Sequence, residues 1–116
     1  MEYKLTIADI SALKNKRRLT MLTAYDYPLA SLIDRAGIDM VLVGDSVANV
    51  VLGLDSTTKV GMSEMLHHAK AVRRAVKNAL VIGDMPFESY QLNPDEAVKN
   101  ARRFIEEAGC DCVKLE

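Results

Sequence analysis

Short apolar runs alternate with amphipathic helical patterns along this chain, and two of the runs end in the same way. Residues 42–45 read LVGD and residues 81–84 read VIGD, and each segment closes a run with the composition of a buried strand. Strands that alternate with helices pair in parallel and are joined by right-handed crossovers. The pattern therefore predicts an α/β fold with a carboxylate at the carboxyl ends of two parallel strands.

Hydrophobic periodicity predicts four strands and four helices. Strands are expected over residues 19–23, 40–43, 79–82 and 112–115. Helices are expected over residues 6–14, from Asp26 to a Gly37 cap, from a Ser63 cap to Val76, and from an Asn93 cap to Gly109. Residues 45–61 are expected to form a loop, and a loop of this length without regular structure is typically functional.

This order of elements fits both a doubly wound sheet and a TIM-type (β/α)8 barrel. A barrel needs eight strands and about 250 residues, whereas this chain has 116 residues and closes on the last predicted strand. On the barrel interpretation we expect residues 1–116 to be the N-terminal half of one catalytic barrel domain, with strands 1–4, apparently truncated.

The composition narrows the class of protein. The formal net charge is −1, which gives no indication of nucleic acid or an anionic membrane as partner. The N-terminus has no signal-peptide apolar stretch, and no apolar run approaches the roughly 18 residues of a membrane span. Cys110 and Cys112 are expected in a strand as reduced core residues, so we expect a cytoplasmic protein.

Acidic residues close three of the predicted strands. Asp45 and Asp84 follow the second and third strands, and Glu116 follows the fourth in the equivalent place. Aspartates in such places also serve as helix caps or turn residues. Three acids that converge on the mouth of a barrel would favour Mg²⁺, which prefers oxygen ligands and retains water.

Other polar residues near these strand ends have two interpretations each. Lys114 should share a face with Glu116 and either hold an anionic substrate group or remain a solvated cation. Ser46 either caps a helix or contacts a ligand, and Tyr25 and Asp26 can enter the same mouth. His67 and His68 are expected at the surface or in helix packing. A solvated helix face is expected from Lys70, Arg73, Arg74 and Lys77.

Several motifs in series resemble the ketopantoate hydroxymethyltransferase family. They are TAYD at 23–26, LVGDS at 42–46, Gly53 with DST at 55–57, DMPF at 84–87 with SY at 89–90, and VKLE at 113–116. The resemblance implies a TIM-type barrel, a homo-oligomer that is a decamer in bacterial members, and Mg²⁺. It also implies transfer of a hydroxymethyl group from 5,10-methylenetetrahydrofolate to 3-methyl-2-oxobutanoate, which gives 2-dehydropantoate for pantothenate and coenzyme A synthesis through a Mg²⁺-stabilised enolate.

The resemblance also implies roles for individual residues. Asp45 and Asp84 would be Mg²⁺ ligands and lie at the substrate, Glu116 would be a further acid at the metal, and Ser46 and Lys114 would contact the keto acid. The catalytic base of the family, a Glu, is expected beyond residue 116. Residues 47–49 (VAN) and 58–61 (TKVG) depart from the family pattern in the loop over the mouth.

Two alternatives stay open at this point. Barrels of the phosphoenolpyruvate mutase and isocitrate lyase group also place acids and Mg²⁺ at strand ends to handle an enolate. An inactive fragment that only associates with other chains is the non-enzymatic alternative, because a half-barrel leaves open sheet edges.

Overall fold

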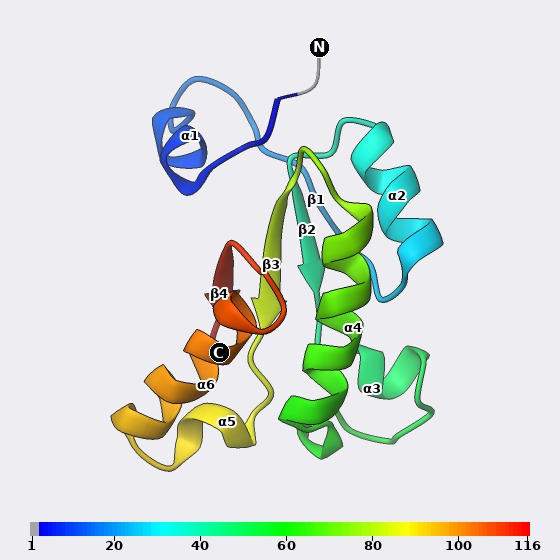
Figure 1. The fold of residues 1–116 in the computed structure, drawn as a ribbon, viewed down its shortest axis with the longest axis vertical. Coiled ribbons are helices and arrows are strands. Elements are labelled where there is room, and N and C mark those ends of the chain that lie inside the picture. The colour runs from blue at the N-terminus through cyan, green and yellow to red at the C-terminus, as the bar shows by residue number, and fades with distance from the viewer. Residues whose placement is uncertain (1–2) are drawn as a thin grey trace.

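The computed structural model describes residues 3–116, which fold around a four-stranded parallel sheet (Figure 1). Its strands are β1 (Met21–Thr23), β2 (Met40–Val43), β3 (Leu80–Asp84) and β4 (Cys112–Lys114). The strands lie side by side in chain order, so each consecutive pair is hydrogen-bonded. The predicted parallel α/β fold is therefore confirmed.

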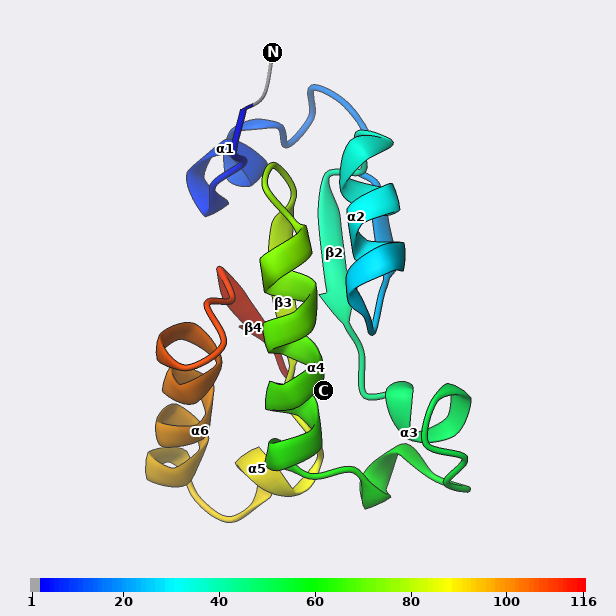
Figure 2. The same cartoon turned by 45° about the vertical axis from the view of Figure 1, so that its right-hand side comes forward.

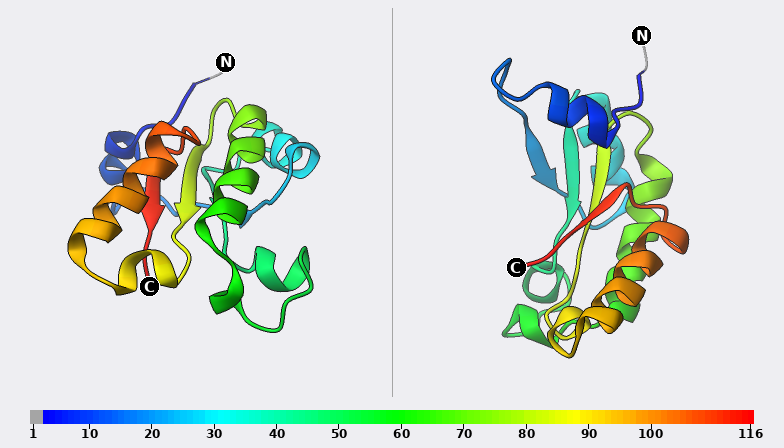
Figure 3. Two further views of the ribbon diagram at one scale, coloured as in Figure 1. Left: turned by 60° about the horizontal axis from the view of Figure 1, so that its bottom comes forward. Right: turned by 90° about the vertical axis from the view of Figure 1, so that its left-hand side faces the viewer.

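Three long helices follow β1, β2 and β3. The helical elements are α1 (Ile7–Ala12), α2 (Tyr27–Arg35), α3 (Val47–Val50), the 3-10 helix η1 (Thr57–Lys59), α4 (Met62–Ala75), α5 (Glu88–Gln91) and α6 (Pro94–Glu106). Helices α2, α4 and α6 lie on one face of the sheet, α1 lies near the start of the strands, and α3 and α5 lie near their other end (Figures 2 and 3). Within residues 3–116 no helix is long and apolar enough to cross a membrane.

This layout decides between the two predicted architectures. A doubly wound sheet carries helices on both faces and reverses its strand order at a switch point. Here the strand order runs β1-β2-β3-β4 without reversal, and the three long helices share one face. The chain therefore has the arrangement of about the first half of a (β/α)8 barrel.

The capping residues predicted for three helices act as expected. Thr6 accepts from the Asp9 amide at 3.1 Å, Asp26 from the Leu29 amide at 3.0 Å, and Asn93 from the Glu96 amide at 2.9 Å. These bonds satisfy amide groups that have no partner within the first helical turn. Gly37 and Gly109 follow α2 and α6 with φ angles of 82° and 74°, a conformation that glycine adopts without strain.

The loop predicted over residues 45–61 is not without regular structure. It contains α3 and η1, and Ser56 caps η1 by accepting from the Thr58 amide at 3.2 Å. Val47 and Ala48 are fully buried, and Asn49 donates to the Leu54 carbonyl at 2.9 Å. The departure at residues 47–49 therefore lies in a packed short helix, not in an open segment over the mouth.

Other predicted boundaries were also wrong. Helix α4 begins after Gly61 instead of Ser63, because the Glu64 carboxylate accepts from the Gly61 amide at 3.1 Å. Val76 has extended backbone after the helix, and Cys110 precedes β4. The first helix ends at Ala12, β1 begins at Met21, β4 ends at Lys114, and the short helix α5 was not predicted.

The predicted apolar stripe of α2 is buried only in part. Ile33 is buried in the core, whereas Leu29 and Leu32 have exposed fractions of 44% and 57%. Leu22 of β1 is also half exposed. Apolar side chains of both α2 and β1 therefore remain exposed within residues 3–116.

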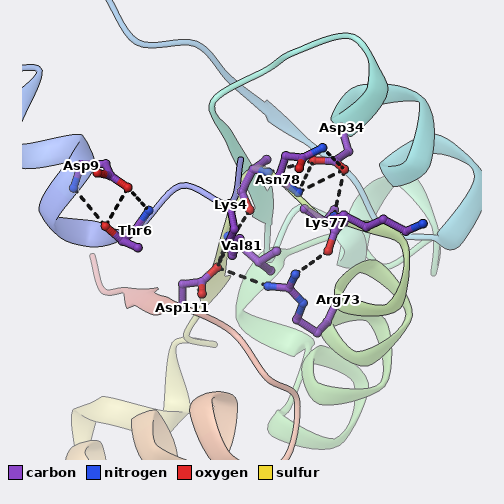
Figure 4. Close-up of polar contacts among 11 residues, drawn as sticks. Lys4, Thr6, Asp9, Asp34, Arg73, Lys77, Asn78, Val81 and Asp111 are labelled. Carbon is purple, nitrogen blue, oxygen red and sulfur yellow. Dashed lines mark hydrogen bonds and ion pairs between the residues drawn. The ribbon is translucent and has the colours of Figure 1, made fainter. Parts of the chain in front are cut away.

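Buried carboxylates fasten the amino-terminal end of the sheet. Asp34 of α2 accepts from the amides of Lys77, Asn78 and Ala79 at 2.9, 3.1 and 2.8 Å, which fixes the turn between α4 and β3 (Figure 4). A carboxylate that accepts several backbone N–H bonds stays buried at little cost, because its charge is solvated by the protein.

Asp111, which is partly buried, is a second carboxylate at this end of the sheet. Its Oδ2 accepts from Lys4 at 2.7 Å, from the Val81 amide at 2.8 Å and from Arg73 at 3.3 Å (Figure 4). Arg73 also donates to the Val76 carbonyl. The prediction that Arg73 belongs to a solvated helix face was therefore wrong, since this side chain ties α4 to the segment before β4.

The close approach of α6 to β3 depends on a glycine. Phe104 is fully buried, and an added Cβ at Gly83 would lie 2.3 Å from its Cδ1 atom. No other residue type leaves room for the ring at this position. The contact lies directly before Asp84, the last residue of β3.

We expect Gly83→Ala to lower the free energy of unfolding by about 1–3 kcal/mol, because the ring must move to admit the methyl group. Urea denaturation checks this. Combining Gly83→Ala with Phe104→Leu should cost less than the sum of the two single changes. Strict additivity would contradict the steric explanation.

Asp39 joins the start of β2 to the segment before β1. The Arg17 guanidinium donates to Asp39 Oδ1 at 2.8 Å and Oδ2 at 2.9 Å, and the Thr20 amide donates to Oδ2 at 2.9 Å. These bonds, with that from Arg17 the largest, hold the pKa of Asp39 well below its ordinary value despite burial. The ionised carboxylate therefore stabilises the fold above the ordinary aspartate pKa of about 3.9.

We expect Asp39→Asn to lower the free energy of unfolding at pH 7 by about 2 kcal/mol, the value of lost charged hydrogen bonds. The native contribution is lost as the pH falls below about 4 toward the lower pKa of the folded state. The gap between variant and wild type should therefore shrink between pH 7 and pH 3 in urea denaturation. A gap independent of pH would contradict the assigned ion pair.

Candidate active site at the carboxyl ends of the strands

Asp45 and Asp84 lie together at the carboxyl end of the sheet. Asp84 is the last residue of β3 and is 3% exposed, and Asp45 follows β2 by two residues. The Asp45 amide donates to Asp84 Oδ2 at 2.9 Å. Because Val43 lies beside Gly83 in the sheet, Asp45 is one residue further along than Asp84. The two similar sequence segments therefore place their carboxylates differently.

Lys114 of β4 lies beside Asp84 in the sheet register. Its Nζ atom is 3.3 Å from Asp84 Oδ1, and it also pairs with the Glu116 carboxylate. The hydrogen bond to Glu116 raises the pKa of Lys114, with Asp84 adding to the effect. Lys114 is thus a cation held between two acids. This arrangement differs from the solvated cation that was one of its two interpretations.

Glu116 does not join the two aspartates in a ligand cluster. Its carboxylate is about two-thirds exposed and is held by Lys114. Within residues 3–116 no three His, Cys, Asp or Glu side chains form a group that could hold a metal ion. The structure therefore brings together Asp45, Asp84 and Lys114, and it places Glu116 at their edge.

Negative charge accumulates around Asp45. Burial, followed by the Asp84 carboxylate, raises the pKa of Asp45 to about 6, and Glu116 adds to the effect while Lys114 opposes it. Carboxylates that repel one another at a strand end are typical of sites that take a cation or a proton. The oxygen-only donors fit a hard divalent cation such as Mg²⁺, which keeps part of its water shell.

Ser46 contacts a residue that follows β1. Its Oγ atom lies 2.6 Å from the Tyr25 hydroxyl, and its side chain makes no capping bond to α3. The capping interpretation of Ser46 was therefore wrong. The Tyr25 carbonyl in turn lies 2.8 Å from His68 Nδ1 on α4.

No local pattern indicated that Tyr25, Ser46 and His68 would meet. They come from three separate segments, and Ser46 and His68 lie 21 and 43 positions after Tyr25 in the sequence. The position of Tyr25 just after β1 was the only signal that it reaches the strand ends.

Comparisons with known proteins agree with the motifs. The sequence profile of the ketopantoate hydroxymethyltransferase family matches residues 4–116. The chain belongs to this family. The family relative from Syntrophomonas wolfei, a 3-methyl-2-oxobutanoate hydroxymethyltransferase, is 63% identical over 103 residues, which cover 89% of this chain and 37% of that protein. The one from Syntrophobacter fumaroxidans is 59% identical over 116 residues, which cover 100% of this chain and 41% of that protein.

This member of the hydroxymethyltransferase family thus spans about two fifths of the length of the curated relatives it matches. Among solved structures, a phosphoenolpyruvate phosphomutase from Streptomyces platensis subsp. rosaceus aligns with a TM-score of 0.72 at 23% identity. The alignment covers 96% of this chain and 38% of the other. At that identity the likeness shows a shared fold, which supports the half-barrel arrangement.

We expect Asp84→Ala to lower the free energy of unfolding of this protein by about 2 kcal/mol in the absence of divalent cations. The reason is that the Asp45 amide and Lys114 lose the carboxylate that accepts their hydrogen bonds. Asp84→Asn should stay within about 1 kcal/mol of wild type. Its amide oxygen still accepts from Asp45, and one source of repulsion toward the Asp45 carboxylate is gone. Urea denaturation in a chelating buffer distinguishes the two variants, and equal losses would contradict the assigned contacts.

Proposed function

We propose that the complete protein containing these residues is a cytoplasmic 3-methyl-2-oxobutanoate hydroxymethyltransferase. It would transfer a hydroxymethyl group from 5,10-methylenetetrahydrofolate to the keto acid and release 2-dehydropantoate for pantothenate and coenzyme A synthesis. The observation that carries this proposal is the match to the family across residues 4–116, with identities of 59% and 63% to two members. The arrangement of Asp45, Asp84 and Lys114 supports it.

Asp45 and Asp84 are the proposed Mg²⁺ ligands, with Glu116 as a further acid reached through water. Their support is that the Asp84 carboxylate accepts from the Asp45 amide and raises the pKa of the Asp45 carboxyl, with the Lys114 ammonium group beside Asp84. When bound, Mg²⁺ supplies a Lewis acid toward the keto and carboxylate oxygens of the substrate.

Lys114 and Ser46 are the proposed contacts to the keto acid, together with the two aspartates. Lys114 is anchored between Asp84 and Glu116, so its charge is already fixed near the strand ends and offsets negative charge on the substrate. The Ser46 hydroxyl makes no capping bond to α3, and when Tyr25 donates in their 2.6 Å contact, Ser46 would donate its own proton to a carboxylate. Both residues would bind and orient the substrate.

The remaining parts of the reaction belong to the rest of the protein. A general base, expected beyond residue 116, would remove the C3 proton of the keto acid. The resulting enolate carbon would attack the folate-borne one-carbon unit. Family membership also favours a homo-oligomer, as in the decamers of bacterial members.

We expect the complete protein to form 2-dehydropantoate in a folate-dependent and Mg²⁺-dependent reaction. Asp45→Asn should lower kcat/KM by about 100-fold or more, because it removes one charged oxygen donor of the proposed metal site. Asp55→Asn is the matched control, since Asp55 is an exposed carboxylate paired with Lys59 at 2.6 Å and should change kcat/KM little.

The same assay tests the alternatives. Turnover of phosphonopyruvate or isocitrate without folate would replace the proposal with an enolate-handling enzyme of that group. Exchange of the C3 proton of the keto acid in deuterated water reports the first step alone. Exchange unaffected by Asp45→Asn would contradict the assigned role of Asp45.

A further inference from the structure

We infer that His68 is a positioning residue for Ser46 and acts through Tyr25. This inference rests on the proposed function, because it concerns how Ser46 is presented to the carboxylate of the keto acid. The residues form one continuous set of contacts from α4, through the end of β1, to the start of α3. The hydrogen bond of His68 goes to the Tyr25 backbone, so its influence on the site is indirect.

The first contact fixes the protonation of the imidazole. His68 Nδ1 lies 2.8 Å from the Tyr25 carbonyl oxygen, and a carbonyl only accepts hydrogen bonds. Nδ1 therefore carries a proton, so a neutral His68 is the Nδ1–H tautomer. This bond holds the backbone of Tyr25 from a rigid helix of 14 residues, Met62–Ala75.

The second contact links Tyr25 to Ser46. The two hydroxyl oxygens are 2.6 Å apart, and either can be the donor. An anionic ligand at Ser46 would select one arrangement, in which Tyr25 donates to Ser46 and the Ser46 proton points to the ligand. Tyr25 would then orient the hydroxyl before the substrate arrives, which saves ordering entropy on binding.

The surroundings of Ser46 leave this hydroxyl little freedom. A Cβ atom added at Gly44 would lie 3.2 Å from Ser46 Oγ, so the side chain folds back over the turn after β2. Ser46 has helical backbone angles and no capping role. Tyr25 is therefore the side chain that decides where the hydroxyl proton points.

Six variants of the complete protein test the inference, and the readouts are the dissociation constant and the KM for the keto acid. His68→Ala and Tyr25→Phe should each raise both values about tenfold, the effect of one charged hydrogen bond. The kcat should change less than about twofold, because the bond holds substrate and transition state alike. The double variant should be no worse than either single variant.

Conservative replacements separate positioning from simple packing. The amide nitrogen of Asn lies near the place of Nδ1, whereas that of Gln lies near Nε2. His68→Asn should therefore restore most of the affinity, and His68→Gln should not. Arg74→Ala is the control, since Arg74 is exposed on the same helix, whereas His67 packs edge-to-face against His68. Nitrogen NMR of the wild type should show a protonated Nδ1 on His68.

The outcomes distinguish the inference from the proposed function. Binding of the keto acid without transfer of a one-carbon unit would overturn the function, and a tenfold weaker affinity in His68→Ala would still support the inference. An active wild type with unchanged affinity in His68→Ala and Tyr25→Phe would overturn the inference alone. Loss of affinity in His68→Asn equal to that in His68→Ala would also overturn it. A wild type that does not bind the keto acid would overturn both.

Discussion

The carboxylate of Asp84 is the contact on which the strand ends depend. It belongs to β3, accepts from the Asp45 amide after β2, and pairs with Lys114 of β4. One buried side chain therefore joins three neighbouring strands at their carboxyl ends. Gly83, directly before it, allows Phe104 of α6 to pack closely against β3 beside Asp84. A packing contact and an electrostatic contact at adjacent residues thus fix the geometry of the candidate site.

The two ends of the sheet use their acids in different ways. At the amino-terminal end, Asp34, Asp39 and Asp111 are saturated by backbone amides and by Arg17, Lys4 and Arg73, so each charge is compensated within the fold. At the carboxyl end, Asp84 and Glu116 share one lysine, and Asp45 lies beside Asp84. Acids that are paired with amides and cations stabilise the fold. Acids that outnumber their cations favour the binding of a cation or a proton. In (β/α)8 barrels the active site lies at the carboxyl ends of the strands. The acids without a matching number of cations lie at that same end of this sheet.

The sequence was sufficient for the features that local interactions decide. Helix caps at Thr6, Asp26 and Asn93 and the parallel strands follow from bonds and periods within a few residues. The repeated Gly-Asp ending predicted that Asp45 and Asp84 would meet. The sequence was insufficient where distant segments decide. Arg73 contacts Asp111, which lies 38 positions away in the sequence, and His68 contacts Tyr25, which lies 43 positions away. The one-residue offset between Asp45 and Asp84 follows from sheet register, which no single segment encodes.

Charge at the candidate site also constrains how an anionic substrate could bind there. Three carboxylates face one ammonium group, so the region at the strand ends is acidic without a ligand. A keto acid alone would add a fourth negative charge next to Asp45 and Asp84, and Coulomb repulsion would oppose it. A divalent cation held by the two aspartates would offset this excess of negative charge, so the substrate carboxylate would meet the cation and Lys114 without a net opposing charge. The charge balance therefore favours an order in which the cation binds before or together with the keto acid, and the neutral Ser46 hydroxyl contributes direction to the interaction without changing the charge.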